Sequence, residues 1–393
     1  MASHCRLCYT YTMYKRQLNL AKLLNKNHFF LFGPRATGKS SLIKSQLKTA
    51  RLFDLLDADT YEELLRRPKA LSEKIKKTDK IVVIDEIQKL PLLLDEVHRL
   101  IETTSIHFLL TGSSARKLRL SGANMLGGRA REAQLFPLTY HELTDFDLLK
   151  YLNFGGLPII WKSEEPIEDL EAYGRLYLSE EIKAEAAVRN YERFVRFMEI
   201  IALSNGQELN YQNLSSDSGV PSRTIEGHIE VLKDTLIGFE LLPYTKTIKR
   251  KCSTKSKFYF FDCGVANYFS RRLPLAENST DLGVNFELFL IQEIRAFLSY
   301  YRIKKDISYW RSKTYEVDLI VGTDLAIEFK LSTQFKPEFL SGLKALKEEK
   351  VKIKRFMVVG RFKSSGTYED IEYLNYETFL KLLWNQKIIS QTF

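Results

Sequence analysis

Cysteines and long apolar runs are both scarce in this sequence, and each shortage excludes a class of protein. Four of the 393 residues are cysteine, which is too few for a disulfide framework and typical of a reducing compartment. Cys5 and Cys8 form a CxxC pair, but no second close pair completes a zinc site. No apolar run approaches the ~18 residues that cross a bilayer, and residues 1–12 lack a signal-peptide core. We therefore expect a cytoplasmic protein without a membrane partner.

Basic residues outnumber acidic residues. The sequence contains 59 Lys and Arg against 49 Asp and Glu, a formal net charge of +10. This excess favours a polyanionic partner such as nucleic acid, although a solvated lysine-rich surface has the same composition. Hydrophobic residues make up 45% of the chain, as in ordinary globular proteins, and the length is enough for two or three domains.

A glycine-rich segment follows the apolar run of residues 29–32 and matches the pattern GxxxxGK[ST]. Its two glycines let the backbone curve closely and turn N–H groups toward phosphate oxygens, and the helix expected after it adds its positive end. The lysine is expected to neutralise the β and γ phosphates and the serine to ligate Mg²⁺. The predicted nucleotide-binding residues here are Gly33, Pro34, Arg35, Ala36, Thr37, Gly38, Lys39, Ser40 and Ser41.

Acidic and hydroxyl side chains follow two further apolar runs. Residues 81–84 lead into Asp85 and Glu86, and we expect Asp85 to hold Mg²⁺ and Glu86 to polarise the attacking water. The next run leads into Thr111 and Ser113, either of which could contact the γ-phosphate, with strand-end capping as the alternative. Because these runs alternate with helical patterns, we predict an α/β fold with a parallel sheet and helices on both faces.

Arg129 follows a pair of glycines after these strands. An arginine there could reach the γ-phosphate of a neighbouring subunit as an arginine finger. Arg116, Arg119 and Arg131 are competing candidates, and an ordinary surface arginine is the alternative for each. The predicted catalytic residues are therefore Lys39, Glu86, Ser113 and Arg129.

Several short runs resemble a family of AAA-type ATPases from bacteria and archaea. They are IDEIQK at 84–89, LTGSS at 110–114, and Gly128-Arg129 followed by LFPL at 135–138. The runs GGLP at 155–158 and YFFDCG at 259–264 are similar to the C-terminal region of that family. The resemblance implies ATP hydrolysis and a homo-oligomer such as a ring, but it identifies no substrate.

The middle of the chain looks like a helix-turn-helix followed by a wing. A turn marked by Gly219 and Pro221 precedes a helical pattern that starts at residue 222, and two apolar runs then enclose a basic loop. Lysines and arginines of such a loop can neutralise phosphates regardless of base sequence, although a protein-contacting winged helix is the alternative. The loop contains Lys246, Lys249, Arg250, Lys251, Lys255 and Lys257. We predict DNA contacts by Arg223, Lys249, Arg250 and Lys251.

The C-terminal third contains charged residues that alternate along two expected strands. A hairpin turn near Thr323 would place Asp318 opposite Glu328, with Lys330 on the same face as Glu328. This arrangement resembles the PD-(D/E)XK nuclease core. The resemblance implies that Asp318 and Glu328 hold a second divalent ion, Mg²⁺ or Mn²⁺, that Lys330 orients water, and that Glu287 joins the site. Related folds also lose cleavage and keep DNA binding, so an inactive domain is the alternative.

The sequence thus predicts four segments. They are an AAA-type P-loop domain at 13–137, a helical linker or lid at 138–189, a winged helix at 190–274 and a restriction-endonuclease-like α/β domain at 275–393. The predicted function is ATP binding and hydrolysis coupled to action on nucleic acid, DNA in the first instance. The alternative is an ATP-regulated signalling or regulatory module whose nuclease-like domain is inactive and contacts protein or nucleic acid.

Overall fold

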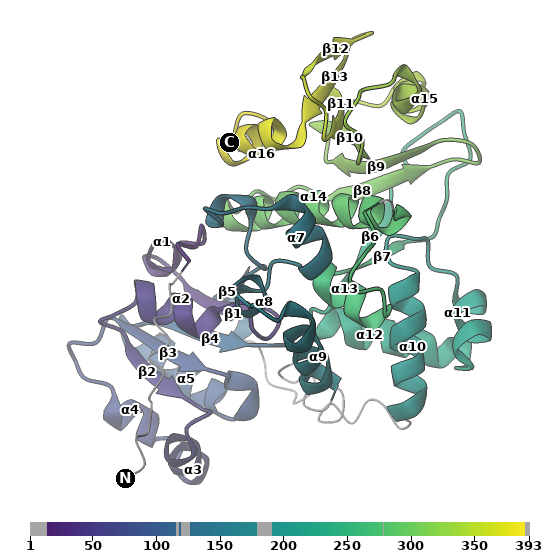
Figure 1. The fold of residues 1–393 in the computed structure, drawn as a ribbon. Helices are drawn as coiled ribbons and strands as arrows, with labels where there is room; N and C mark the ends of the chain where they lie inside the picture. Colours follow the sequence, from purple (N-terminus) through teal and green to yellow (C-terminus); the bar gives the residue numbers. More distant parts are fainter. Residues whose placement is uncertain (1–13, 115–117, 119–125, 179–190, 278, 390–393) are drawn as a thin grey trace, which may run out of the picture.

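The computed structural model describes residues 14–114, 118, 126–178, 191–277 and 279–389. Figure 1 shows two β-sheets, with the long helix α14 (Thr280–Tyr300) running beneath the C-terminal sheet toward the N-terminal one. Cys5, Cys8, Arg116 and Arg119 lie outside the described residues. Within the described ranges, no helix is both long enough and apolar enough to cross a membrane.

The N-terminal sheet is parallel throughout, in the order β2-β3-β4-β1-β5. Its strands are β1 (His28–Phe32), β2 (Arg51–Asp54), β3 (Ile81–Asp85), β4 (His107–Gly112) and β5 (Ala130–Gln134). Its helices are α1 (Leu20–Leu24), α2 (Lys39–Gln46), α3 (Ala58–Arg66), α4 (Ala70–Lys74) and α5 (Leu93–Thr103), with short 3₁₀ turns η1 (Ile87–Lys89) and η2 (Leu126–Gly128). Successive side chains of β1 pack into two different hydrophobic clusters: Phe30 belongs to one and Leu31 to the other. The predicted parallel sheet covered on both faces is confirmed.

Strand β5 was not predicted from the sequence. Its residues, AREAQ, contain no apolar run, and only Ala133 is buried. The strand lies at the edge of the sheet, where one neighbour and exposed side chains are normal. The hydrophobic pattern therefore carries little information about it.

A helical region connects the two sheets. It contains η3 (Tyr140–Glu142), α7 (Leu148–Phe154), α8 (Pro158–Trp161), α9 (Pro166–Tyr177), α10 (Tyr191–Leu203), α11 (Tyr211–Ser218), α12 (Ser222–Asp234) and α13 (Cys263–Phe269). Asn210 caps the start of α11 by accepting backbone N–H groups, and Gly219, at φ +67°, ends it. The turn then leads into α12, as the helix-turn-helix pattern predicts.

The C-terminal sheet is mixed, in the order β12-β13-β11-β10-β9-β8-β6-β7. Its strands are β6 (Gly238–Pro243), β7 (Lys257–Phe260), β8 (Ile307–Arg311), β9 (Glu316–Val321), β10 (Leu325–Lys330), β11 (Arg355–Gly360), β12 (Gly366–Tyr368) and β13 (Ile371–Asn375). The helices η5 (Pro337–Leu340), α15 (Ser341–Glu348) and α16 (Tyr376–Trp384) accompany them. Because β6 pairs with β8 through Leu242 and Ser308, the β6–β7 hairpin is continuous with the strands that carry Asp318 and Glu328.

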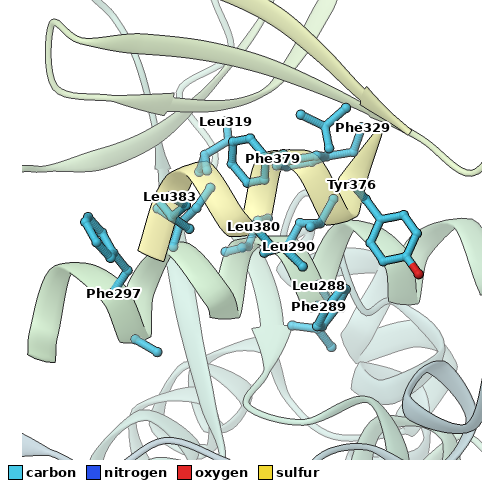
Figure 2. Packing of buried hydrophobic residues seen from close by; sticks show 14 of the residues in the cluster. Leu288, Phe289, Leu290, Phe297, Leu319, Phe329, Tyr376, Phe379, Leu380 and Leu383 are labelled. Atoms are coloured by element: carbon cyan, nitrogen blue, oxygen red, sulfur yellow. The ribbon is translucent and has the colours of Figure 1, made fainter. Parts of the chain in front are cut away.

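Helix α14 forms the core between these parts. In Figure 2 α16 lies along α14, with Leu380 and Leu383 between the two helices and Leu319 entering from the sheet. The same cluster contains Phe136, which follows β5 of the N-terminal sheet. One buried cluster therefore joins the N-terminal sheet to the C-terminal sheet through α14.

Candidate nucleotide site and C-terminal carboxylate cluster

The predicted phosphate-binding loop connects β1 to α2. Gly38 has φ +93°, a conformation that side-chain-bearing residues rarely adopt, and it directly precedes the first residue of α2. A Cβ on Gly33 would lie 2.7 Å from the carbonyl oxygen of Leu135. The local backbone therefore requires glycine at both positions, and it directs the amino end of α2 into the loop.

Lys39 reaches back across the loop. Its ammonium donates to the carbonyl oxygens of Gly33 at 2.7 Å and Pro34 at 3.2 Å, and the side chain is 7% exposed. The Thr37 hydroxyl donates to the same Pro34 carbonyl at 2.8 Å. The loop is thus curved around the lysine, with the positive charge at its centre.

Side chains from the ends of three neighbouring elements meet beside Lys39. Ser40 Oγ donates to Asp85 Oδ2 at 2.8 Å, and Thr111 Oγ1 donates to Asp85 Oδ1. The Glu86 N–H donates to Thr111 Oγ1 at 3.1 Å. Because β4 is the neighbour of β3 in the sheet, Thr111 lies next to both Asp85 and Glu86. A hydroxyl and a carboxylate at this separation fit the oxygen ligands that Mg²⁺ takes in nucleotide sites.

Glu86 is held by a residue that the sequence analysis did not single out. The Gln88 amide donates to Glu86 Oε2 and, at 3.3 Å, to Ser113 Oγ. Glu86 itself has φ +61°, which turns the chain sharply at the end of β3. Gly112 makes room for this contact, because a Cβ there would lie 2.6 Å from Gln88 Oε1. The only signal in the sequence was the position of Gln88 within the IDEIQK run.

Arg129 is not near the phosphate-binding loop of its own chain. It precedes β5, whose first residue, Ala130, pairs with His28 at the start of β1, whereas the loop follows the end of β1. A strand of this length separates the two by ~16 Å at ~3.3 Å per residue. Arg129 instead pairs with Glu102 at 2.7 Å. An arginine-finger role is therefore compatible only with a neighbouring subunit.

Arg16 forms a buried network that was also missed. Its guanidinium donates to the Thr37 carbonyl at 2.6 Å and pairs with Glu142 at 3.0 Å. It also donates to the Phe136 carbonyl at 2.5 Å and the Tyr300 hydroxyl at 3.3 Å. Burial lowers the pKa of Arg16, but the opposing effects, led by the charge of Glu142, are stronger, so the pKa is raised. No sequence pattern distinguished this arginine from a surface residue.

The C-terminal carboxylates lie together as predicted. Strand pairing of Ile327 with Leu319 places Asp318 opposite Glu328 in the next step of the register, and the Phe329 N–H donates to Asp318 Oδ2 at 2.8 Å. Lys330 Nζ donates to Glu328 Oε1 at 2.5 Å. Burial, followed by the charges of Glu328 and Glu287, raises the pKa of Asp318 well above its usual value. Burial also raises the pKa of Glu328 to about 7.

Lys257, which the sequence pattern assigns to the basic loop, belongs to a strand instead. It lies in β7 with its side chain 4% exposed, and its ammonium pairs with Glu316 at 2.5 Å and Glu287 at 3.3 Å. The Tyr259 hydroxyl donates to the same Glu287 at 2.5 Å. Among the described residues, no three His, Cys, Asp or Glu side chains are arranged to hold a metal ion. The cluster in this conformation therefore does not fit the predicted second metal.

The basic loop of the hairpin is attached to α15. Arg250 pairs with Glu348 at 2.5 Å and with the buried Glu349 at 2.8 Å. Glu349 also accepts the backbone N–H groups of Ile248 at 3.0 Å and Lys249 at 2.6 Å. Arg250 is thus engaged within the protein rather than presented to solvent. The side chains of Lys249, Lys251 and, on the first turn of α12, Arg223 are exposed.

Residues 25–144 match the family described as "AAA domain", in agreement with the parallel sheet and the loop geometry. This part of the chain is therefore similar to AAA domains. Residues 145–276 and 282–379 match two domains of unknown function, DUF8612 and DUF4143.

Two relatives of the chain are each described as an uncharacterized protein. A protein of Methanocaldococcus jannaschii is 23% identical, with 91% of this chain and 85% of that protein covered. A protein of Mycobacterium tuberculosis is 26% identical, with 74% of this chain and 66% of that protein covered.

Solved structures with some likeness include the Aeropyrum pernix ORC1 protein in complex with DNA. It is 15% identical with a TM-score of 0.24, and 66% of this chain and 93% of that chain are covered. A STAND ATPase with a tetratricopeptide repeat sensor from Pyrococcus horikoshii is 16% identical with a TM-score of 0.24, and 74% of this chain and 48% of that chain are covered. At these TM-scores, neither likeness bears on function.

Proposed function

We propose that this chain binds ATP with Mg²⁺ at the phosphate-binding loop and hydrolyses it. The observation that carries the proposal is the hydrogen bond of 2.8 Å between Ser40 Oγ and Asp85 Oδ2. Ser40 directly follows Lys39, whose ammonium lies within the loop, 2.7 Å from the Gly33 carbonyl oxygen. Lys39 and Ser40 are the first two residues of α2, whereas Asp85 ends β3, and nothing in the packing of β3 requires a carboxylate at the amino end of that helix. The arrangement of these three residues fits the recognition of a metal-bound triphosphate.

Each residue then has a distinct role in the proposed reaction. Backbone N–H groups of residues 33–41 and the Lys39 ammonium bind the phosphates, and Ser40 and Asp85 would hold Mg²⁺, which offsets phosphate charge. Glu86 polarises the attacking water once its carboxylate is no longer held by Gln88. Thr111 contacts both acids and Ser113 accepts a hydrogen bond from Gln88, and these contacts support a role for the two hydroxyls at the γ-phosphate.

We further propose that nucleotide binding controls how the C-terminal part engages nucleic acid, with DNA as the partner. Arg16 supports this coupling, because it contacts both the phosphate-binding loop and Tyr300 of α14. The exposed lysines of the β6–β7 loop and Arg223 of α12 support a winged-helix contact with phosphates.

The domain division is also part of this proposal: a P-loop domain at 13–137, a helical linker at 138–189, a winged helix at 190–274 and a nuclease-like domain at 275–393. For the last domain, the ion pairs of Lys257 and Lys330 favour a binding role over cleavage. That observation supports the second candidate, a regulatory module whose nuclease-like domain is inactive.

ATP turnover with and without duplex and single-stranded DNA tests the proposal. We expect Mg²⁺-dependent turnover in the wild type, stimulation by DNA, and loss in Lys39→Ala. Wild-type turnover in Lys39→Ala would contradict the assignment of the loop. If neither duplex nor single-stranded DNA changes the rate of ATP turnover, the proposed nucleic-acid partner is wrong. The proposed ATP hydrolysis would still stand.

Arg129 gives a test of the proposed homo-oligomer. We expect Arg129→Ala alone to lose turnover, because it supplies no finger to a neighbour, and Lys39→Ala alone to lose it at the phosphate-binding loop. A mixture of the two variants should regain part of the activity. Unchanged turnover in Arg129→Ala would exclude this arginine as the finger.

A further inference from the structure

Four carboxylates gather where α14 meets the C-terminal sheet, and a lysine from outside that core is inserted among them. The carboxylates belong to Glu287 on α14, Glu316 and Asp318 on β9, and Glu328 on β10. The lysine is Lys257, which belongs to the preceding β6–β7 hairpin rather than to the strands that carry the acids.

Burial makes the cation necessary. Asp318 is 7% exposed and Glu328 is 8% exposed, and like charges so placed repel one another strongly where water cannot screen them. The ammonium of Lys257 bridges Glu287 and Glu316 and lies 5.2 Å from the centre of the Tyr309 ring, which adds a favourable cation–π contact. A lysine can be this deeply buried only because the carboxylates compensate its charge.

These ion pairs leave one carboxylate oxygen of the cluster without a partner among the described residues. Lys330 engages Glu328 Oε1, while Glu328 Oε2 is buried and accepts no hydrogen bond in the described part of the chain. A buried carboxylate oxygen without a donor is costly and indicates that the cluster can accept a further positive group.

We propose that Lys257 is the resident cation of this cluster, and that its ammonium occupies the space a divalent ion needs in order to bridge Glu287 to Asp318 and Glu328. A divalent ion then binds only when Lys257 leaves. Because Lys257 belongs to the β6–β7 hairpin, the hairpin and the metal compete for one set of carboxylates, and the closed cluster fastens the hairpin to the C-terminal sheet.

Direct titration of the nucleotide-free full chain with Mn²⁺, followed by electron paramagnetic resonance of the free ion, tests this competition. We expect Lys257→Met to bind Mn²⁺ at least about tenfold more tightly than the wild type, because a buried positive charge is removed. The matched control is Lys255→Met, an exposed lysine on the same hairpin, which should bind as the wild type does. The double variant Lys257→Met with Asp318→Asn should lose the gain in Mn²⁺ affinity. That loss would locate the Mn²⁺ site at the cluster that contains Asp318.

Two results would overturn the proposal. One is equal Mn²⁺ affinity in the wild type and Lys257→Met, and the other is a gain that Asp318→Asn does not remove. If Lys257→Met does not fold, acylation of lysines in the wild type tests whether Lys257 and Mn²⁺ compete for the carboxylates. Lys257 should be protected in EDTA and become reactive in step with Mn²⁺ binding at the cluster, whereas Mn²⁺ binding that requires Asp318 and leaves Lys257 protected would refute competition.

Discussion

Arg16 and Tyr300 are 284 residues apart in the sequence, yet the guanidinium of the first donates to the hydroxyl of the second at 3.3 Å. The same guanidinium donates to the Thr37 carbonyl of the phosphate-binding loop at 2.6 Å. Tyr300 Oη also accepts the Phe136 N–H at 3.1 Å. The end of α14 is therefore tied through one buried arginine to the loop that is proposed to bind ATP.

Tyr300→Phe tests this connection with the smallest change. Loss of the hydroxyl leaves the Phe136 N–H without its acceptor and removes one of the acceptors of Arg16, which should cost about 1–3 kcal/mol of stability. It should also raise the KM for ATP more than it lowers kcat, because Arg16 positions the loop. Thermal unfolding and steady-state kinetics measure the two effects. Tyr61→Phe on α3 is the matched control, and an equal change in KM there would refute a specific link.

Ser40→Ala and Asp85→Asn should impair the same step. Both variants remove an oxygen ligand proposed for Mg²⁺, so each should lower kcat/KM on the order of 10²-fold. The double variant should lose much less than the product of the two single losses, since the residues act as one unit. ATPase kinetics over a range of Mg²⁺ concentrations provides the comparison. Fully multiplicative losses would show that the residues act independently.

Gln88→Ala should release Glu86. The amide of Gln88 donates to the Glu86 carboxylate, and a hydrogen bond to a charged group is worth about 1.5–3 kcal/mol. Without it, the carboxylate is free to reach water, so basal ATP turnover without DNA should rise severalfold. Glu86→Gln should still bind ATP and lose turnover. A fall in basal turnover in Gln88→Ala would instead assign Gln88 a direct role in the reaction.

The hairpin lysines should set the salt dependence of DNA binding. Replacing exposed Lys246, Lys249 and Lys251 with Gln should reduce the slope of log affinity against log salt by about 0.9 for each phosphate that is no longer neutralised. Replacing the exposed Lys76, Lys77 and Lys80, which precede β3, is the matched control and should leave the slope unchanged.

Arg250→Gln should act differently from the lysine variants. It breaks the pairs with Glu348 and the buried Glu349, so it should lower thermal stability more than the DNA-binding slope. A slope that no hairpin variant changes would exclude the hairpin as a DNA contact.

His228 should make stability fall in mild acid. Its ring lies 4.9 Å from Phe194 and 5.2 Å from Phe197, and burial lowers the pKa of His228 to about 4 from 6.5. Between these values the unfolded chain binds a proton that the folded chain does not, so its contribution is complete above pH ~6.5 and declines by about 1.4 kcal/mol per pH unit down to pH ~4.

His228→Leu removes this pH-dependent contribution to the free energy of unfolding. The difference in unfolding temperature between wild type and variant should therefore change over pH 4–6.5 and stay constant above it. A constant difference across the whole range would indicate that His228 is hydrated in the folded state.

Local patterns in the sequence were enough to predict that the residues of the proposed nucleotide site lie together. The loop residues 33–40 are contiguous, and Asp85 and Thr111 end apolar runs, so a parallel sheet necessarily brings them to one edge. The Asp318–Glu328 pairing was predictable for a similar reason, because a tight turn between two strands fixes their register.

Only the tertiary structure decided the contacts between distant segments. It buried Arg16 against Tyr300, paired Lys257 of the expected basic loop with Glu287 and Glu316, and attached Arg250 to α15. A charged side chain has the same pattern in a sequence whether it faces solvent or a buried partner, since burial depends on which distant residues compensate the charge. The sequence alone thus determined the chemistry at the strand ends, whereas long-range packing determined which of its charges remain exposed.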